Sequence, residues 1–472
     1  MENKIISKIK ELIITNKLIC TLMFATLFIF ASTLWYPFVY AAALVLAIGM
    51  IFLDFNDIFC VYIYTGVFGC FLVPFIAAII AGFVIIVIKY IIDIRKKRQE
   101  FLKVPFIITT IISVLFSIVH YEINDLGAYQ GIMIIAFLYF IYFMVVYRDK
   151  LNIKKLFDYL FLGLTVSIAM SAVLYILPGA TTLSFDNESG NYIYASMRDK
   201  VAFYDGTYTR IVLTAFHVNH LAAFCLFAMA YSAVVLLTKK NKSKKEIIYY
   251  LAMYAVNLVV GFLTLSKAFM VVFAFEVLVL LVYYCIKHKK KALRVIGIII
   301  ALLLLFCLVF RQRLDTILER FFIYNYDTLL GMLTTGRSGI WQQYANAILE
   351  SPLKLLFGFG LFSQEQLLIG PHNFYIFILY RFGLIGILML AYLVYSYVKS
   401  IKAKPNFSIR LSLILLTFLV IGLQEACFDE RFFFFVIGIA LMCFSGNKEV
   451  KKVDKQAENL KQSEIDVEIK NK

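Results

Sequence analysis

Residues 18–53 read LICTLMFATLFIFASTLWYPFVYAAALVLAIGMIFL, an apolar run too long for one membrane-spanning helix. A hydrocarbon layer about 30 Å thick needs about 20 apolar residues in helical conformation. The central WYP interrupts the run, because proline lacks the backbone N–H that a helix interior requires. The run therefore predicts a helical hairpin, in which two spans meet at the WYP turn.

Apolar runs of this kind recur through the 472-residue chain, of which 62% is hydrophobic and 16% is charged. Inside a bilayer every backbone polar group must be paired within the protein, which favours helices. We therefore expect an all-α polytopic membrane protein with about 14 transmembrane helices, arranged as one bundle over residues 1–445. A second hairpin is expected over residues 58–94, with its break near Pro74. Further spans are expected at roughly 102–119, 129–147, 156–177, 211–237, 247–265, 268–286, 294–310, 373–398, 411–424 and 432–445.

The net charge of +16 comes largely from lysines and arginines clustered in short segments between apolar runs. Examples are RKKRQE at 95–100 and TKKNKSKKE at 238–246. Short basic loops stay in the cytoplasm, so this bias indicates topology and argues against nucleic-acid binding. With these loops inside, both termini are cytoplasmic and residues 446–472 form a charged cytoplasmic tail. The outer segments are a first outer loop at 178–209, a large outer loop at 311–371, and the short turn EACFDER at 425–431.

Processing, disulfides and metal binding have little support in the sequence. The first apolar run is not followed by a small-residue cleavage site, so we expect a retained span and no removed signal peptide. Of the eight cysteines, only Cys427 falls clearly outside an apolar run or its edge, which indicates buried thiols. We expect neither a metal nor a cofactor.

The large outer loop contains TTGRSGIWQQYANAILESP at 334–352, which predicts a helix. Thr334 or Thr335 can cap this helix, and Pro352 ends it. One of its faces is apolar and is expected to lie on the membrane surface or against the bundle. That face consists of Ile340, Trp341, Tyr344 and Ile348.

Cations in the outer segments break the bias that governs the rest of the chain. Several cations converging on the outer ends of helices suit an anionic headgroup, especially a diphosphate. The alternative for each residue alone is a surface cation that extends toward lipid phosphate. The residues are Arg210, Lys267, Arg311, Arg313, Arg320 and Arg337.

His372 and Asn373 begin the span that follows the large outer loop. Because imidazole gains and loses a proton near neutral pH, a histidine there can take a proton from a reacting hydroxyl. A helix cap or a packing role is the alternative for His372. The following GLIG, Gly383 to Gly386, predicts close helix packing and no chemistry.

Polar residues also occur inside the expected spans. His217, Asn219 and His220 lie two to three helical turns inward from Arg210, where substrate lining and structural hydrogen bonding are both open. Glu276 and Arg381 each lie nine residues inward from an outer helix end, at Lys267 and His372 respectively. At about 1.5 Å per residue both reach a depth of about 13 Å, which predicts an ion pair.

The motifs TGRSGIW, SPLKLLFGFG and PHNFYIFILYRFGLIG follow one another along the chain. In this order they resemble the C-terminal signature of the O-antigen ligase and Wzy-type O-antigen polymerase superfamily. TR with FHVNHLA is similar to the family's span with arginine and asparagine, and LTLSKAFM is similar to its Ser-Arg turn. Lys267 stands where arginine is usual, which keeps the charge but loses the planar guanidinium. The resemblance covers at most residues 200–445.

The resemblance implies glycosyl transfer on the outer face of a bacterial cytoplasmic membrane, from an undecaprenyl-diphosphate-linked glycan. It implies a fold like that of the lipid-dependent integral-membrane (GT-C-like) glycosyltransferases, without metal or nucleotide sugar. In this scheme His372 is the general base, while Arg210, Lys267 and Arg337 bind the diphosphate. The other implied substrate-binding residues are Asn373, His217, Asn219, His220, Arg313 and Arg320.

The sequence leaves three activities open. A composition rich in lysine, isoleucine and phenylalanine is typical of the AT-rich genomes of many Gram-positive bacteria, which lack a lipopolysaccharide core. It therefore favours a polymerase of repeat units for capsule or exopolysaccharide. A ligase that attaches glycan to another acceptor is the alternative. A flippase is a third possibility, although transporters commonly carry internal repeats that this chain lacks. Expected partners are lipid-linked oligosaccharide, membrane lipid, a flippase and a chain-length regulator.

Overall fold

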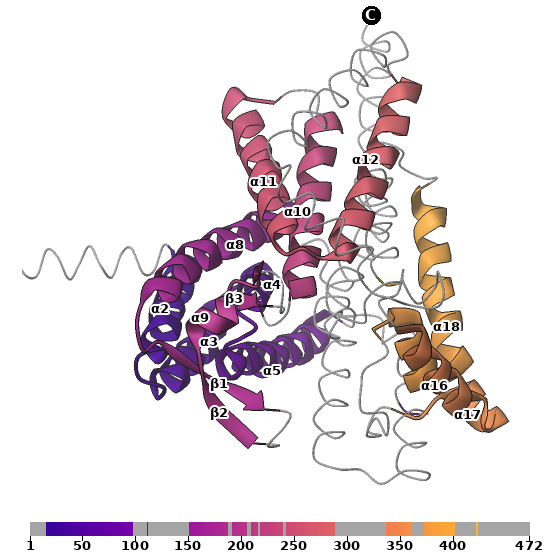
Figure 1. The fold of residues 1–472 in the computed structure, drawn as a ribbon, viewed down its shortest axis with the longest axis horizontal. Helices are drawn as coiled ribbons and strands as arrows, with labels where there is room; N and C mark the ends of the chain where they lie inside the picture. The colour runs from indigo at the N-terminus through magenta and orange to yellow at the C-terminus, as the bar shows by residue number, and fades with distance from the viewer. Residues whose placement is uncertain are drawn as a thin grey trace, which may run out of the picture.

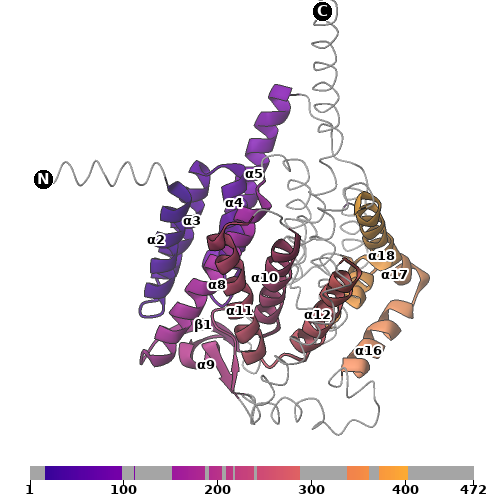
Figure 2. The same cartoon turned by 90° about the horizontal axis from the view of Figure 1, so that it is seen from above.

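The computed structural model describes residues 16–97, 111, 151–186, 191–204, 209–215, 218–238, 242–287, 337–360, 372–401 and 422. These residues are mostly helical, which confirms the predicted class in its main feature. Helices α2 to α5 and α8 lie on one side of the molecule and α16 to α18 on the other, with α12 between α10 and α18 (Figures 1 and 2).

The first apolar run forms the predicted hairpin. Helix α2 (Lys17–Ser32) and helix α3 (Phe38–Phe52) pack along each other and are joined by a turn at residues 33–37 that contains the WYP. Gly49 of α3 faces Thr21 of α2 so closely that a β-carbon there would lie 2.4 Å from the threonine methyl group. Close packing of two apolar helices thus accounts for the hairpin.

The second hairpin is also present, but the turn between its two helices lies a few residues before Pro74 and not at it. Helix α4 (Phe55–Gly66) ends before a turn at residues 67–71, and α5 runs over Leu72–Lys97. Pro74 lies in the first turn of α5, where a missing N–H disrupts no helical hydrogen bond. The 12-residue α4 is almost fully buried and would span only about 18 Å. It is therefore a central packing element that is shorter than a bilayer is thick.

Three described helices are long and apolar enough to cross a membrane: α8 (Ile153–Ile176), α10 (Val218–Thr238) and α11 (Lys244–Leu263). They match the predicted spans within a few residues, except that α10 starts at Val218 and not at 211. Helix α12 (Lys267–Lys287) matches the span predicted at 268–286. α10 is buried on nearly all sides, so it forms the centre of this part of the bundle.

The first outer loop contains strands, which corrects the all-α prediction. Strands β1 (Thr181–Asp186) and β2 (Asn191–Ser196) pair antiparallel and project from the helices (Figure 1). A short helix, α9 (Met197–Val201), leads to a second antiparallel pair, β3 (Ala202–Tyr204) and β4 (Thr209–Ile211). The backbone N–H of Thr181 donates to the carbonyl of Thr33 at 2.9 Å, which ties the loop to the α2–α3 turn.

The large outer loop contributes two helices that pack on the following span. α16 (Arg337–Leu349) is the predicted helix, while Pro352 opens a separate short helix, α17 (Pro352–Phe357), which Ser351 caps. α18 runs over Phe374–Ile401 with a kink at Gly383. Phe374, Ile378 and Phe382 of α18 join the main core, whereas Tyr380 packs with Tyr344, Ile348 and Phe359 in a second cluster. The predicted apolar face of α16 therefore lies against α18.

Five predicted spans fall almost entirely outside the described residues: 102–119, 129–147, 294–310, 411–424 and 432–445. The charged tail at 446–472 and the EACFDER turn also lie outside them. The count of about 14 helices, the GT-C-like arrangement and the division of the chain at residue 445 therefore remain predictions.

Candidate functional site

Arg210 reaches the turn between α11 and α12. Arg210 lies in β4, opposite Phe203 of β3, and is only 9% exposed. The guanidinium Nε donates a hydrogen bond to the carbonyl oxygen of Thr264, the C-cap residue of α11, at 3.0 Å. This bond satisfies a carbonyl that the helix end leaves unpaired, and it fixes the plane of the guanidinium. The sequence suggested that Arg210 opens a transmembrane helix. In the structure it belongs to strand β4, and the helix α10 begins later, at Val218.

Asn219 and Ser266 bring the N-termini of α10 and α12 together. The Ser266 hydroxyl donates to Oδ1 of the buried Asn219 at 2.9 Å. The same oxygen of Ser266 accepts the backbone N–H of Phe269 at 3.4 Å, so Ser266 caps α12. A helix N-terminus carries a partial positive charge, and two of them meet at this hydrogen bond.

Lys267 is the first residue of α12, and its Nζ atom is buried. Its location in the same turn places it next to Ser266 and three residues after Thr264, the partner of Arg210. The structure thus gathers Arg210, Asn219 and Lys267 around one turn. The half-buried His220 follows Asn219 in α10.

The backbone of this turn is tightly constrained. Leu265 has a φ of +49°, a left-handed conformation that few residues other than glycine adopt. The Thr264 hydroxyl donates to the carbonyl of Gly261 at 2.6 Å and accepts the backbone N–H of Ser266 at 3.2 Å. Thr264 was not singled out in the sequence, because its contact with Arg210 uses a backbone oxygen that every residue possesses.

Asn373 caps α18, and His372 precedes the cap. Asn373 Oδ1 accepts the backbone N–H groups of Tyr375 at 3.0 Å and Ile376 at 3.1 Å. The cap role that was an alternative for His372 therefore falls to Asn373. His372 is half-buried and has a φ of +45°, again in the left-handed region. Non-glycine residues in that region cluster at functional sites, where the surrounding structure holds them.

Arg337 is the half-buried first residue of α16. Because Tyr344 of α16 stacks edge-on against Tyr380 of α18 with 4.9 Å between ring centroids, the helices that carry Arg337 and His372 pack together. The remaining predicted site residues, His217, Arg313 and Arg320, lie outside the described residues, as does Arg311.

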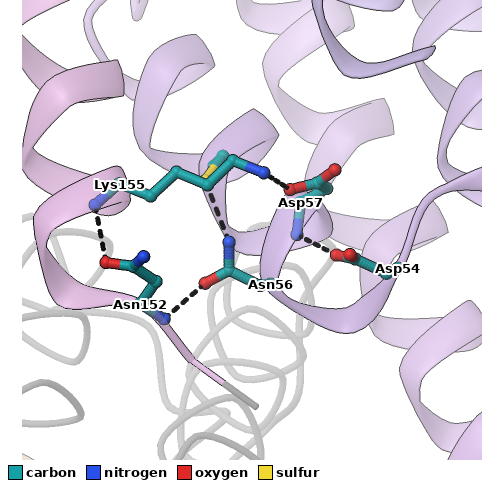
Figure 3. Close-up of polar contacts among 6 residues, drawn as sticks. Asp54, Asn56, Asp57, Asn152 and Lys155 are labelled. Atoms are coloured by element: carbon teal, nitrogen blue, oxygen red, sulfur yellow. Dashed lines mark hydrogen bonds and ion pairs between the residues drawn. The ribbon is translucent and has the colours of Figure 1, made fainter. Parts of the chain in front are cut away.

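A second polar cluster joins α4 to α8 (Figure 3). The Lys155 ammonium pairs with the Asp57 carboxylate, and Asn56 Oδ1 accepts the backbone N–H of Asn152 at 2.7 Å. Asp54 and Asn152 cap their helices by accepting the N–H groups of Asp57 and Lys155.

This second cluster lies far from the α11–α12 turn. Tyr249 at the start of α11 donates to Asp158 of α8 at 2.9 Å, so the beginnings of α8 and α11 lie together. From Tyr249 to Thr264 the helix rises about 22 Å. The cluster therefore links helices at the opposite end of the bundle. In the described part of the chain, no group of three or more His, Cys, Asp or Glu side chains could hold a metal ion.

The segment that carries most of these residues can be compared with known families. Residues 251–391 match the family model described as O-antigen ligase. This match confirms the resemblance that the motifs indicated. Thr264, Ser266, Lys267, Arg337 and His372 all lie within the O-antigen ligase segment (residues 251–391), whereas Arg210 and Asn219 reach it from outside.

Members of the O-antigen ligase family are glycosyltransferase-like enzymes that act on lipid-linked glycans in membranes. The match supports a role of ligase or polymerase type in the assembly of cell-surface glycans. The apolar helices and the family together indicate a membrane protein. No curated protein is significantly similar to the chain.

Proposed function

We propose that this chain is a polysaccharide polymerase that joins undecaprenyl-diphosphate-linked repeat units on the outer face of the cytoplasmic membrane. Its product would be a capsule, O-antigen or exopolysaccharide. The observation that supports this most strongly is the α11–α12 turn, where Arg210 and Lys267 lie beside the joined N-termini of α10 and α12. Guanidinium, ammonium and helix N-termini are the groups that bind phosphate in proteins.

The reaction breaks the bond between the anomeric carbon of the donor sugar and a diphosphate oxygen. The diphosphate leaves with the electron pair and gains negative charge. Fixed positive groups stabilise that charge more in the transition state than in the donor, which is the source of catalysis. Arg210, Lys267 and Arg337 fill this role, so the proposed leaving group needs no metal ion. His217, Asn219, His220, Arg313 and Arg320 are further candidates for contact with the donor.

The acceptor hydroxyl attacks the anomeric carbon and loses its proton. His372 takes this proton as general base, and its imidazolium then releases it to water. Asn373 holds the start of α18 and so fixes the backbone next to His372. In the cell, a flippase would supply the donor and a chain-length regulator would act on the product.

A ligase is the second candidate, because the matching family model is described as O-antigen ligase. In a ligase the donor site is unchanged, but the acceptor hydroxyl belongs to a different molecule from the lipid-linked repeat unit. The two functions therefore differ in the acceptor and share the chemistry of Arg210, Lys267 and His372.

The test is to reconstitute the purified protein in liposomes with a lipid-diphosphate-linked oligosaccharide as the only glycan. A polymerase yields a ladder of lengthened lipid-linked products, whereas a ligase yields product only after a second acceptor is added. Arg210→Gln should abolish either product. Lys245→Gln, which removes an exposed cation at the other end of α11, is the matched control and should leave the yield unchanged. If lipid-linked glycan only crosses the bilayer, the protein is a transporter and the proposal is wrong.

A further inference from the structure

The turn after α17 is clamped to the kink of α18. The backbone N–H of Phe359 donates to the carbonyl of Tyr380 at 2.7 Å, and that of Gly360 donates to the carbonyl of Arg381 at 3.1 Å. The kink at Gly383 therefore coincides with two α18 carbonyls whose hydrogen bonds come from another segment. Two segments about twenty residues apart thus pair backbone to backbone.

Glycines on both sides make this approach possible. Gly358 has a φ of +75°, and a β-carbon on it would lie 2.5 Å from the Arg381 carbonyl carbon. Gly383 has a φ of +63°, and a β-carbon on it would lie 2.3 Å from the Leu356 carbonyl oxygen. At both positions the positive φ and the lack of space exclude a side chain. The clamp therefore requires glycine at position 358 and at position 383.

The clamp lies well along an apolar helix. Tyr380 and Arg381 follow the first residue of α18, Phe374, by six and seven residues, which corresponds to a rise of about 9 to 10.5 Å. The stretch Phe374–Leu388 is an apolar helix. Backbone that enters this depth must have its polar groups paired within the protein, and the two hydrogen bonds of the clamp provide such pairing.

Three leucines on the clamped helices face outward. Leu349 at the end of α16 and Leu353 and Leu356 of α17 are 66%, 51% and 41% exposed, and we call them the leucine face. The backbone carbonyl of Leu356 lies against Gly383, and the next residue of α18, Leu384, is 40% exposed. The leucine face therefore lies on a segment that packs directly on an apolar helix with an exposed leucine at the point of contact.

The charged residues nearby are suited to the border of a membrane. Lys354 pairs with the exposed Glu350 and lies 4.8 Å from the centroid of the Phe359 ring. A long lysine side chain can place its stem against apolar groups while its ammonium group stays near lipid headgroups.

We propose that α17 and the end of α16 form a lipid-facing wedge in the leaflet from which α18 begins. The leucine face contacts lipid acyl chains there, and the Gly358–Gly383 clamp holds the wedge against α18. A helix with leucines on one face and charged groups beside it penetrates about 5–10 Å into the boundary between headgroups and acyl chains, which agrees with the depth of the clamp. The large outer loop is thus partly immersed in the membrane. This inference does not depend on the proposed glycosyl transfer.

Tryptophan fluorescence in nanodiscs tests the wedge directly. The chain has two tryptophans, Trp35 and Trp341, and replacing both with phenylalanine gives a protein without tryptophan fluorescence. Leu353→Trp, Leu356→Trp and Leu349→Trp are then introduced one at a time. The matched control is Gln343→Trp, since Gln343 is exposed and lies about 120° around α16 from Leu349.

Lipids brominated on the acyl chain should quench the three leucine-position probes by at least half, and aqueous iodide should leave them nearly unchanged. The Gln343→Trp probe should show the reverse pattern. Equal iodide quenching at positions 343, 353 and 356, without quenching by brominated lipid, would overturn the proposal. Leu349 is the most exposed of the three, so the quenching of its variant decides between the two outcomes even if the other two variants fail to fold.

Discussion

At the scale of single residues, His372 combines a proton-accepting side chain with a backbone conformation that few residues adopt. Asparagine tolerates the left-handed region and keeps hydrogen bonding, but it does not gain a proton near neutral pH. We therefore expect His372→Asn to be produced and inserted normally, while the rate of glycan transfer falls by about 10² to 10⁴. Transfer measured in liposomes, normalised to folded protein, checks this.

A second substitution separates the imidazole from the backbone strain. His372→Gly removes the side chain and accepts a φ of +45° without steric conflict, so its thermal midpoint should equal or exceed that of the native chain. Its transfer rate should match that of His372→Asn. Native rates in both variants would exclude His372 as the base, and the search would turn to His217, His220, Glu425 and Asp429.

The predicted ion pair between Glu276 and Arg381 is also a question at residue scale. Both side chains are buried, with 2% and 0% exposure, as expected for charges within a bundle. We expect Glu276→Arg and Arg381→Glu each to reduce the yield of folded protein strongly, and the double variant to restore it. Yield is measured by size-exclusion chromatography in detergent. Two defective single variants without rescue would show that these charges pair with other groups.

At the scale of elements, the glycines of the clamp should differ from a glycine that has room for a side chain. Gly358→Ala and Gly383→Ala each force a β-carbon to within about 2.5 Å of backbone atoms and a left-handed φ, so each should lower the thermal midpoint markedly. Gly339→Ala is the control, since no atom outside its own stretch of helix lies within 4 Å of its β-carbon position and alanine favours the α16 helix by about 1 kcal/mol. Similar midpoints for all three variants would contradict the role of the clamp.

The turn between α11 and α12 makes a second prediction at this scale. Ser266→Ala removes the hydroxyl that caps α12 and binds Asn219, so Lys267 should lose its fixed position. A cap contributes about 1 kcal/mol to stability, and the protein should still fold. We expect a higher KM for the lipid-linked donor, and Ser266→Thr, which keeps the hydroxyl, should restore it. An unchanged KM in Ser266→Ala would separate this turn from the donor.

At the scale of the whole molecule, the direction of the helices sets which end faces the cytoplasm. The basic segment before α11 predicts that its start is inside, and Arg210 binds at its other end. A membrane-impermeant thiol reagent applied to intact spheroplasts should therefore label Thr209→Cys and not Lys245→Cys, while both should react after lysis. The described native cysteines are buried or half-buried, and Cys427, which the predicted topology places in the outer EACFDER turn, is replaced by serine in both variants so that it adds no background. Labelling of Lys245→Cys in intact spheroplasts would reverse the topology.

The amino-acid sequence alone was sufficient to predict most of the described helices. The apolar lengths and the WYP break predicted the α2–α3 hairpin, and helical periodicity predicted α16 and its apolar face. The motif order predicted the family that residues 251–391 match. These features are local, since the length and periodicity of apolar residues decide which segment leaves water and in what conformation.

Only the tertiary structure decided how the site is assembled. The partner of Arg210 is the carbonyl oxygen of Thr264, 54 residues away. Because every residue has a backbone carbonyl, the sequence does not indicate which one Arg210 binds. The clamp between Gly358 and Gly383 likewise depends on which distant backbone groups meet. Such meetings follow from the packing of the whole bundle, in which many small contacts together outweigh the local preferences of any one segment.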